Sequence, residues 1–298
     1  MSPVMRHLSR RMFSAQALLA AGGWAAGVWR ASADAKRPLK VYIFADMEGI
    51  SGITHSGQTL ADGAAYGEGC RLMEADINAC VAGCFDAGAT EVTVRDGHGR
   101  GNNVDPARVD PRARLVQGPT PGVRFGGFEG SAALILLGYH AKALTPEALL
   151  AHSYSSLTIQ GMWLNGREAG EIGVDTAIAA EHGVPVVMVS GCDKAVAEAW
   201  EWIPGVVTVQ TKRSTGVQSA VCLPLESARR MIREKAAEAV RRRQAIAPVA
   251  VAYPVTLRMD FLPQGSLRTY DPAFTPTSSP RRVERTGDSV EKLLLNKN

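Results

Sequence analysis

Short apolar runs alternate with helical patterns along most of the chain, and this alternation constrains the fold more than any other feature. The apolar runs predict strands at residues 41–45, 91–95, 132–137 and 185–189. The helical patterns predict helices at about residues 64–87, 172–182, 194–201 and 225–244. Strand–helix–strand alternation favours an α/β fold, in which we expect a layered mixed sheet with helices on both faces.

We expect a smaller α+β subdomain beside this sheet. Asn165-Gly166 stands between extended-looking residues, which is a hairpin signal and predicts antiparallel pairing. After residue 249 the strand-like run VAVAYPVTLRMDFL leads into a polar tail. Residues 272–290 are rich in Pro, Ser, Thr and Arg, so we expect them to be poorly ordered or peripheral, and we expect a short helix at 290–295.

The N-terminus has the pattern of an export signal. Ser9-Arg10-Arg11-Met12-Phe13 is a twin-arginine motif, a modestly apolar stretch follows, and Ala33-Asp34-Ala35 suits a signal peptidase. An amphipathic N-terminal helix is the alternative interpretation. No other stretch reaches the roughly 18 apolar residues of a membrane span, so we expect a periplasmic or secreted protein that leaves the membrane after cleavage. The expected parts are a signal peptide, a main domain and a partly disordered C-terminal extension, at residues 1–35, 40–245 and 246–298.

Composition and charge limit the classes of function. The chain of 298 residues carries a formal net charge of +4. Residues 1–35 account for most of that charge, so the near-neutral remainder does not indicate a nucleic-acid partner. The five cysteines form no CxxC pair, which excludes zinc-knuckle and thioredoxin motifs. Cys80 and Cys84 are one helical turn apart and are expected to pack in the core.

Potential metal ligands follow three of the predicted strands. Asp46 and Glu48 follow the first strand, His98 follows the second, and His140 follows the third. Side chains at the carboxyl ends of strands in an open α/β sheet meet at one edge, where ligands bind. Residues spaced by two in extended chain point the same way, and two carboxylates held that close are costly without cations. Carboxylate and imidazole groups are the ligands of zinc and its neighbours.

Two further residues complete the candidate set. Glu171 stands at a predicted helix start, with Glu168 as its competitor, and His152 follows twelve residues after His140. Each residue alone has an ordinary interpretation, because an Asp-x-Glu pair is more often a surface turn and a single histidine is more often hydrogen-bonded at a rim. The hypothesis of a metal site rests on the whole set. His55 and His182 are expected at the surface.

The motifs around these residues resemble those of a known family. From about residue 40 to residue 244 the chain is similar to the bacterial zinc D-aminopeptidases associated with dipeptide transport, although Gly97 stands where that family usually has serine. The motifs occur in the family's order: Asp46-Met47-Glu48-Gly49-Ile50-Ser51-Gly52, Asp96-Gly97-His98, Gly138-Tyr139-His140, His152-Ser153, Asn165-Gly166 with Gly170-Glu171-Ile172-Gly173, and Val187-Met188-Val189-Ser190-Gly191-Cys192-Asp193.

The resemblance implies an activity and roles for the site residues. It implies hydrolysis of the N-terminal residue of short peptides, in particular D-amino-acid peptides or amides, at a site with two zinc ions. Asp46 would bridge the ions, and His152 would be the catalytic residue. The remaining ligands would be Glu48, His98, His140 and Glu171. The family also forms ring-shaped homo-oligomers. Mn²⁺ and Co²⁺ tolerate similar ligands, so the residues alone do not select the metal.

Two alternatives stay open at the level of sequence. Another binuclear hydrolase, such as an amidase or a phosphoesterase, could use Arg95, Arg100 and the glycines of residues 97–101 to bind an anionic group. A non-catalytic periplasmic protein that binds peptide or metal would not need His152. It would keep Asp46, His98 and Glu171. Turnover by the metal-loaded protein would distinguish an enzyme from a binding protein.

Overall fold

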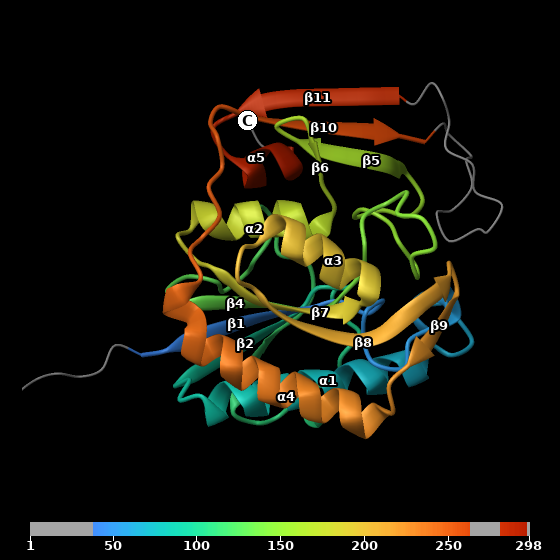
Figure 1. Cartoon of the computed structure of the whole chain (residues 1–298), viewed down its shortest axis with the longest axis vertical. Helices are drawn as coiled ribbons and strands as arrows, with labels where there is room; N and C mark the ends of the chain where they lie inside the picture. The colour runs from blue at the N-terminus through green and yellow to red at the C-terminus, as the bar shows by residue number, and fades with distance from the viewer. Residues whose placement is uncertain (1–37, 263–280, 297–298) are drawn as a thin grey trace, which may run out of the picture. The chain divides into compact units, whose positions relative to one another are not determined.

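A seven-stranded sheet forms the centre of the protein (Figure 1). The structure is a computed structural model, and it describes residues 38–262 and 281–296. Its strands lie in the order β3-β2-β1-β4-β7-β8-β9, and only the β8–β9 pair is antiparallel. The strands are β1 (Lys40–Ala45), β2 (Glu91–Asp96), β3 (Ala113–Val116), β4 (Ala133–Tyr139), β7 (Val186–Cys192), β8 (Val207–Gly216) and β9 (Ser219–Cys222). The four predicted strands are therefore present.

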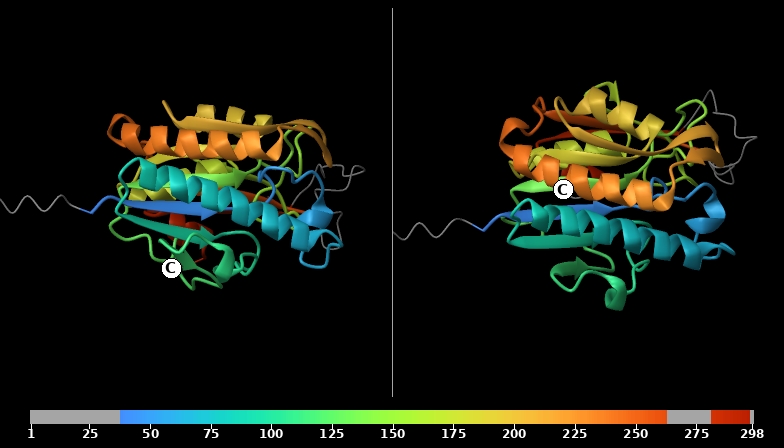
Figure 2. Two further views of the ribbon diagram at one scale, coloured as in Figure 1. Left: turned by 90° about the horizontal axis from the view of Figure 1, so that it is seen from below. Right: turned by 60° about the horizontal axis from the view of Figure 1, so that its bottom comes forward.

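Helices cover both faces of this sheet. One face carries α1 and α4, which lie side by side (Figure 2), and the other carries α2 and α3. Their bounds are α1 (Tyr66–Asp86), α2 (Glu171–Glu181), α3 (Asp193–Trp202) and α4 (Leu225–Arg242), and short 3-10 helices occupy Ser56–Gln58, Pro106–Arg108 and Arg243–Ala245. The predicted α/β class with a mixed sheet between helix layers is confirmed. No helix in the described ranges is long and apolar enough to cross a bilayer.

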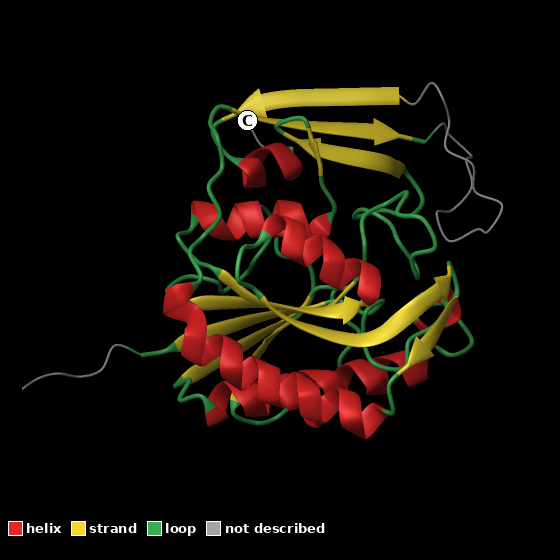
Figure 3. Ribbon diagram, viewed as in Figure 1, coloured by secondary structure: helices red, strands yellow, loops and turns green. Residues whose placement is uncertain are grey.

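A second, smaller sheet lies beyond α2 and α3 (Figure 3). Its antiparallel strands follow the order β11-β10-β5-β6 and are β5 (Ile159–Leu164), β6 (Arg167–Glu168), β10 (Val255–Phe261) and β11 (Arg281–Gly287). The β5–β6 hairpin turns at Asn165 and Gly166, whose φ angles of 49° and 79° are those of a tight hairpin turn. The predicted hairpin is present, and this sheet with α5 (Val290–Leu294) corresponds to the expected subdomain.

The described part of the predicted C-terminal extension, residues 246–298, contributes two strands to the second sheet. Strand β10 pairs with β5, and β11 pairs with β10 along its whole length, so residues after 245 complete the second sheet. Residues 281–287 were expected to be poorly ordered or peripheral, and they are peripheral, because they form an edge strand of this sheet. The alternating exposed side chains of this strand explain why it resembles a polar tail in sequence. The predicted signal peptide at residues 1–35 lies outside the described residues, as does the segment 263–280.

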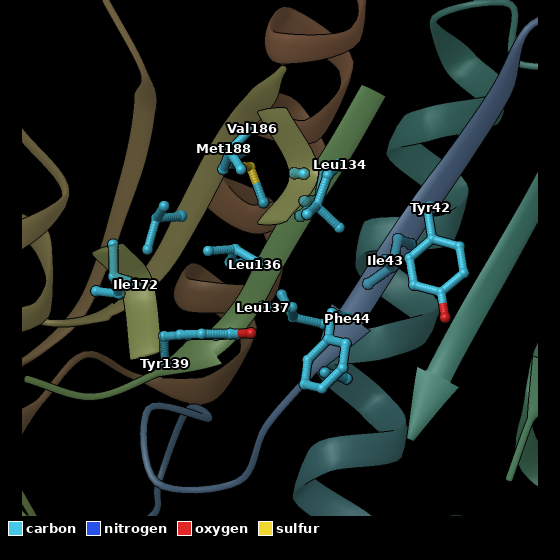
Figure 4. Close-up of a cluster of buried hydrophobic side chains, with 14 of the residues drawn as sticks. Tyr42, Ile43, Phe44, Leu134, Leu136, Leu137, Tyr139, Ile172, Val186 and Met188 are labelled. Atoms are coloured by element: carbon cyan, nitrogen blue, oxygen red, sulfur yellow. The ribbon is translucent and has the colours of Figure 1, made fainter. Parts of the chain in front are cut away.

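The main core forms where the central strands are covered on both faces. Figure 4 shows Tyr42 and Phe44 from β1 beside Leu134 and Leu136 from β4, with Met188 of β7 near them. All of these side chains are buried. A strand covered on both faces is apolar at nearly every position, which explains the continuous apolar runs in the sequence. Burying each such side chain contributes about 1.5–3 kcal/mol to folding.

The strand order creates a crevice between β1 and β4. The chain passes from β1 to β2 and β3 on one side and then returns to β4 on the other side. Such a reversal separates the connections at the carboxyl ends of the two strands, and ligands bind there. The Asp46 amide donates to the Leu137 carbonyl at 2.8 Å, and the Gly49 amide donates to the Gly138 carbonyl at 2.7 Å. The residues after β1 are thus fixed against the end of β4.

Gly138 permits this close approach, and its replacement tests the packing. Its φ is +74°, and a Cβ there would lie 2.4 Å from the Asp46 carbonyl oxygen. Gly88 has a similar φ of +88° with nothing within 4 Å of a Cβ. We expect Gly88→Ala to lower the free energy of unfolding by about 1 kcal/mol and Gly138→Ala by about 3 kcal/mol or more. Urea denaturation measures both, and equal losses would show that the crevice tolerates a side chain without cost.

Candidate metal centre

The six residues predicted from the sequence meet at this crevice. Asp46 and Glu48 directly follow β1, and His140 directly follows β4. His98 is the second residue after β2, Glu171 is the first residue of α2, and His152 lies in the loop between β4 and β5. Asp46, Glu48, His140, His152 and Glu171 are all buried, and the His98 side chain is 15% exposed. Glu168, the competitor of Glu171, is exposed on β6 and pairs with Lys142 instead.

His98 faces two carboxylates with one ring nitrogen. Its Nδ1 lies 2.9 Å from Asp46 Oδ1 and 3.2 Å from Glu48 Oε2. Its Nε2 lies 2.9 Å from the carbonyl oxygen of Thr59, in the turn before α1. A carbonyl oxygen can only accept, so the Nε2 atom carries the proton of that hydrogen bond. The lone pair of the neutral ring is therefore on Nδ1 and points at the carboxylates.

His140 has the same arrangement with its nitrogens exchanged. Its Nδ1 donates to the Ala141 carbonyl at 3.0 Å. Its buried Nε2 makes no hydrogen bond, although Asp46 Oδ2 and Glu171 Oε1 each lie 3.4 Å away. A buried nitrogen lone pair that faces two carboxylate oxygens is unfavourable unless a cation lies between them. This geometry fits a metal ligand whose other ring nitrogen is fixed by a main-chain oxygen.

His152 is the third histidine of this kind. Its Nδ1 donates to the Leu150 carbonyl at 2.9 Å, and its Nε2 lies 3.7 Å from Glu171 Oε1. Its ring stacks on the ring of His140, with centroids 3.9 Å apart and an interplanar angle of 13°. The proximity of His152 to His140 and Glu171 means that it is within reach of a metal ion as well as of a substrate.

The side chains divide into two overlapping ligand sets. The ligand atoms of Asp46, Glu48 and His140 lie within 4.8 Å of one another, as do those of His140, His152 and Glu171. Carboxylate oxygens with imidazole nitrogens are the donor set of zinc sites. The residues present therefore fit a divalent metal ion of this type.

The charges of these groups shift one another's pKa values. Burial acts to lower the pKa of His98, but Glu48 and Asp46 raise it well above its ordinary value. Burial acts in the same way on His140, and Asp46 and Glu171 raise its pKa well above the ordinary value. A proton and a metal ion compete for the same lone pairs, so these shifts indicate where a cation is most favourable. For His152, burial and then the nearby His140 lower the pKa, so its ring stays neutral.

A buried ion-pair network behind Glu171 was not predicted from the sequence. Arg124 binds both oxygens of Asp175 at 2.8 Å and lies 3.6 Å from Glu171 Oε2. Its guanidinium lies over the rings of Phe44 and Tyr154, and the Tyr154 amide donates to Glu171 Oε1 at 2.8 Å. Asp175 stands four residues after Glu171 in the otherwise apolar stretch EIGVDTAIAA. This spacing places both carboxylates on one face of the helix, and it is the sequence feature that could have indicated the network. The network orients the Glu171 carboxylate.

Glu198 is a second buried acid that the sequence did not reveal. It lies on α3, and its Oε2 accepts the Lys142 amide at 2.7 Å, so it fixes the chain just after His140. Burial raises its pKa from 4.5 to about 6, an effect that its hydrogen bond to the Lys142 amide only partly offsets. Its partner is a main-chain amide far away in the sequence, which explains why no motif pointed to it.

The raised pKa of Glu198 predicts a pH-dependent loss of stability. The folded state binds its proton more tightly than the unfolded state, so Glu198 contributes most stability below pH 4.5. This contribution of about 2 kcal/mol is lost as the pH rises through 6 to about 7. Glu198→Gln keeps an acceptor for Lys142 and cannot titrate. In chelator-treated protein, the free energy of unfolding of the wild type should fall by that amount relative to Glu198→Gln. Parallel pH profiles would contradict this account.

A comparison with known families agrees with the geometry of the site. A profile of the D-aminopeptidase family matches residues 39–294. The chain belongs to the D-aminopeptidase family. The resemblance of the motifs is thereby confirmed, and the match extends through β10, β11 and α5. The D-aminopeptidase family therefore includes the C-terminal elements that the sequence had suggested were an extension.

Relatives from Bacillus subtilis support this assignment. A D-aminopeptidase of Bacillus subtilis (strain 168) is 33% identical over 229 residues, which are 76% of this chain and 83% of that protein. A solved structure, described as the Zn-dependent D-aminopeptidase DppA from Bacillus subtilis, a self-compartmentalizing protease, superposes with a TM-score of 0.76 at 29% identity. The superposition covers 87% of this chain and 97% of DppA.

Proposed function

We propose that this D-aminopeptidase family member is a zinc-dependent aminopeptidase that removes a D-amino acid from the N-terminus of short peptides or amides at a site with two zinc ions. The observation that carries the proposal is the convergence of three carboxylates with the ring nitrogens of His98, His140 and His152 that do not bind main-chain carbonyls. The names of the two Bacillus subtilis relatives support zinc as the metal and D-residues as substrates.

The position of Asp46 supports the proposal of two ions. Its Oδ1 is directed to His98 and its Oδ2 to His140, so its two oxygens face different ligand groups. Glu48 lies on the His98 side, and Glu171 lies on the His140 side. Asp46 would therefore hold both ions, and Glu48, His98, His140 and Glu171 would be the remaining ligands.

His152 is assigned to proton transfer. Bound zinc supplies a Lewis acid that polarises a carbonyl group and makes a water molecule acidic near neutral pH. The Leu150 carbonyl holds the proton of His152 on Nδ1, so Nε2 is the ring nitrogen that would accept a proton at the reacting end of the site. The lowered pKa keeps this ring neutral and able to act as a base. Its stacking on the His140 ring keeps the ring from rotating away.

Substitution of Asp46 and His152 separates metal binding from proton transfer. We expect Asp46→Ala to lose both bound zinc and activity, because it removes the carboxylate between His98 and His140. We expect His152→Ala to keep its zinc while kcat falls by about 10²–10⁴-fold. His182→Ala is the matched control, because His182 is exposed and outside the site. Elemental analysis and a peptidase assay on the same preparations measure both quantities.

Two outcomes would contradict these assignments. Loss of zinc from His152→Ala would make His152 a metal ligand, as its distance to Glu171 allows. Retention of two zinc ions by Asp46→Ala would remove Asp46 from the centre.

The alternative of a phosphoesterase has less support. Arg95 is buried and donates to the Val116 carbonyl, so it is not free for an anionic substrate at the crevice. Arg100 is exposed in the loop after β2. The family relationship also favours peptide substrates over phosphate esters.

We also propose that the chain assembles into a closed homo-oligomer and is exported by the twin-arginine route. The description of DppA as self-compartmentalizing supports the first proposal, and the molar mass of the purified protein tests it. The Ser9-Arg10-Arg11-Met12-Phe13 motif supports the second proposal.

A further inference from the structure

Lys212 is a buried lysine of β8 that lies beneath the metal centre. Its side chain is almost fully buried, although lysine is seldom buried without partners. The Nζ atom donates to three main-chain carbonyls, those of Glu48 at 2.8 Å, Ile50 at 2.7 Å and Ile53 at 2.7 Å. An ammonium group has three hydrogens to donate, so these contacts use all of them.

The three carbonyls belong to the turn that carries the first two metal ligands. This turn, residues 46–53, follows β1 and includes the carboxylates of Asp46 and Glu48. Carbonyl dipoles that point at one spot repel one another unless a positive charge lies among them. The Lys212 ammonium supplies that charge, in the way that a bound cation does in a carbonyl cage.

Other side chains fix the same turn from two directions. Thr211 Oγ1 donates to the Gly49 carbonyl at 3.0 Å, and the Ser51 amide donates to buried Asp76 Oδ2 at 2.8 Å. The main-chain groups of the turn are therefore bound by a hydroxyl and a cation from β8 and by an anion from α1. Lys212 alone holds three carbonyls in that set, which makes it the central support.

We propose that Lys212 is a positioning residue for the metal centre, which holds the turn in its binding geometry before any metal is bound. This inference rests on the metal site of the proposed function. A buried charge is costly, and an apolar side chain of similar size often stabilises a core as well or better. The presence of a buried ammonium group at this position is therefore best explained by the main-chain geometry that it imposes on the turn, through the three carbonyls that it binds. Ligands that are already in place bind a metal ion more tightly, because less conformational freedom is lost on binding.

A merely structural role for Lys212 would give a different result from a positioning role. Lys212→Met keeps the length of the side chain and removes its charge. Val209→Ala is the control, because Val209 is a core residue of the same strand and has no part in the site. We expect Lys212→Met to raise the zinc Kd at least tenfold in a chelator competition assay. We expect Val209→Ala to lower the denaturation midpoint while its zinc Kd stays within twofold of the wild type.

Hydrogen exchange in the metal-free wild type tests the proposal without any substitution. Four amides of this turn donate hydrogen bonds and can be followed by exchange, namely those of Gly49, Ile50, Ser51 and Ile53. We expect their protection to change less than threefold when zinc is removed, because Lys212 already holds the turn. We also expect these amides to exchange at least tenfold faster in metal-free Lys212→Met than in the metal-free wild type.

Each possible outcome bears on the proposal. Protection that appears in the wild type only with zinc would overturn it, even if Lys212→Met does not fold. An unchanged zinc Kd in folded Lys212→Met would also overturn it while leaving the proposed function intact. A wild type that binds no zinc would instead refute the proposed function, and with it this inference.

Discussion

Three histidines in the crevice each give one ring N–H to a main-chain carbonyl, and the whole site depends on that constraint. Because the proton is fixed on one nitrogen, the other nitrogen presents its lone pair to a carboxylate of Asp46, Glu48 or Glu171. Buried lone pairs and carboxylates repel one another unless a cation lies among them. Without metal, protons supply that positive charge at His98 and His140, as their raised pKa values indicate. A metal ion would take the place of these protons, and the surrounding fold holds the side chains in position for it.

The fold supplies that order from both sheets. The central sheet brings the ends of β1, β2 and β4 to one edge, and the crevice between β1 and β4 is where the strand order reverses. The second sheet lies over α2, whose first residue is Glu171. The C-terminal helix also contributes, because Glu291 accepts the Arg124 amide at 2.6 Å and Arg124 pairs with Asp175. The C-terminal segment is therefore connected to the residues that orient Glu171.

The sequence was sufficient for the parts of the site that depend on local pattern. Apolar runs followed by Asp46, His98 and His140 predicted both the strands and their common edge, since parallel strands must end on the same side. The supporting residues were not predicted, because their partners are distant in the chain: Lys212 binds a carbonyl 164 residues away, and Arg124 pairs with Asp175 51 residues away. Strand β11 was missed for another reason, which is that an exposed edge strand keeps few apolar residues.

The central claim is a two-zinc site that acts on D-residues. The most direct test is to measure zinc per chain and the rates on D-alanyl and L-alanyl amides with one purified sample. Our account predicts two zinc ions per chain and faster hydrolysis of the D-alanyl amide, with both lost together on chelation. Fewer than two zinc ions in active protein, or equal or faster hydrolysis of the L-alanyl amide, would contradict it.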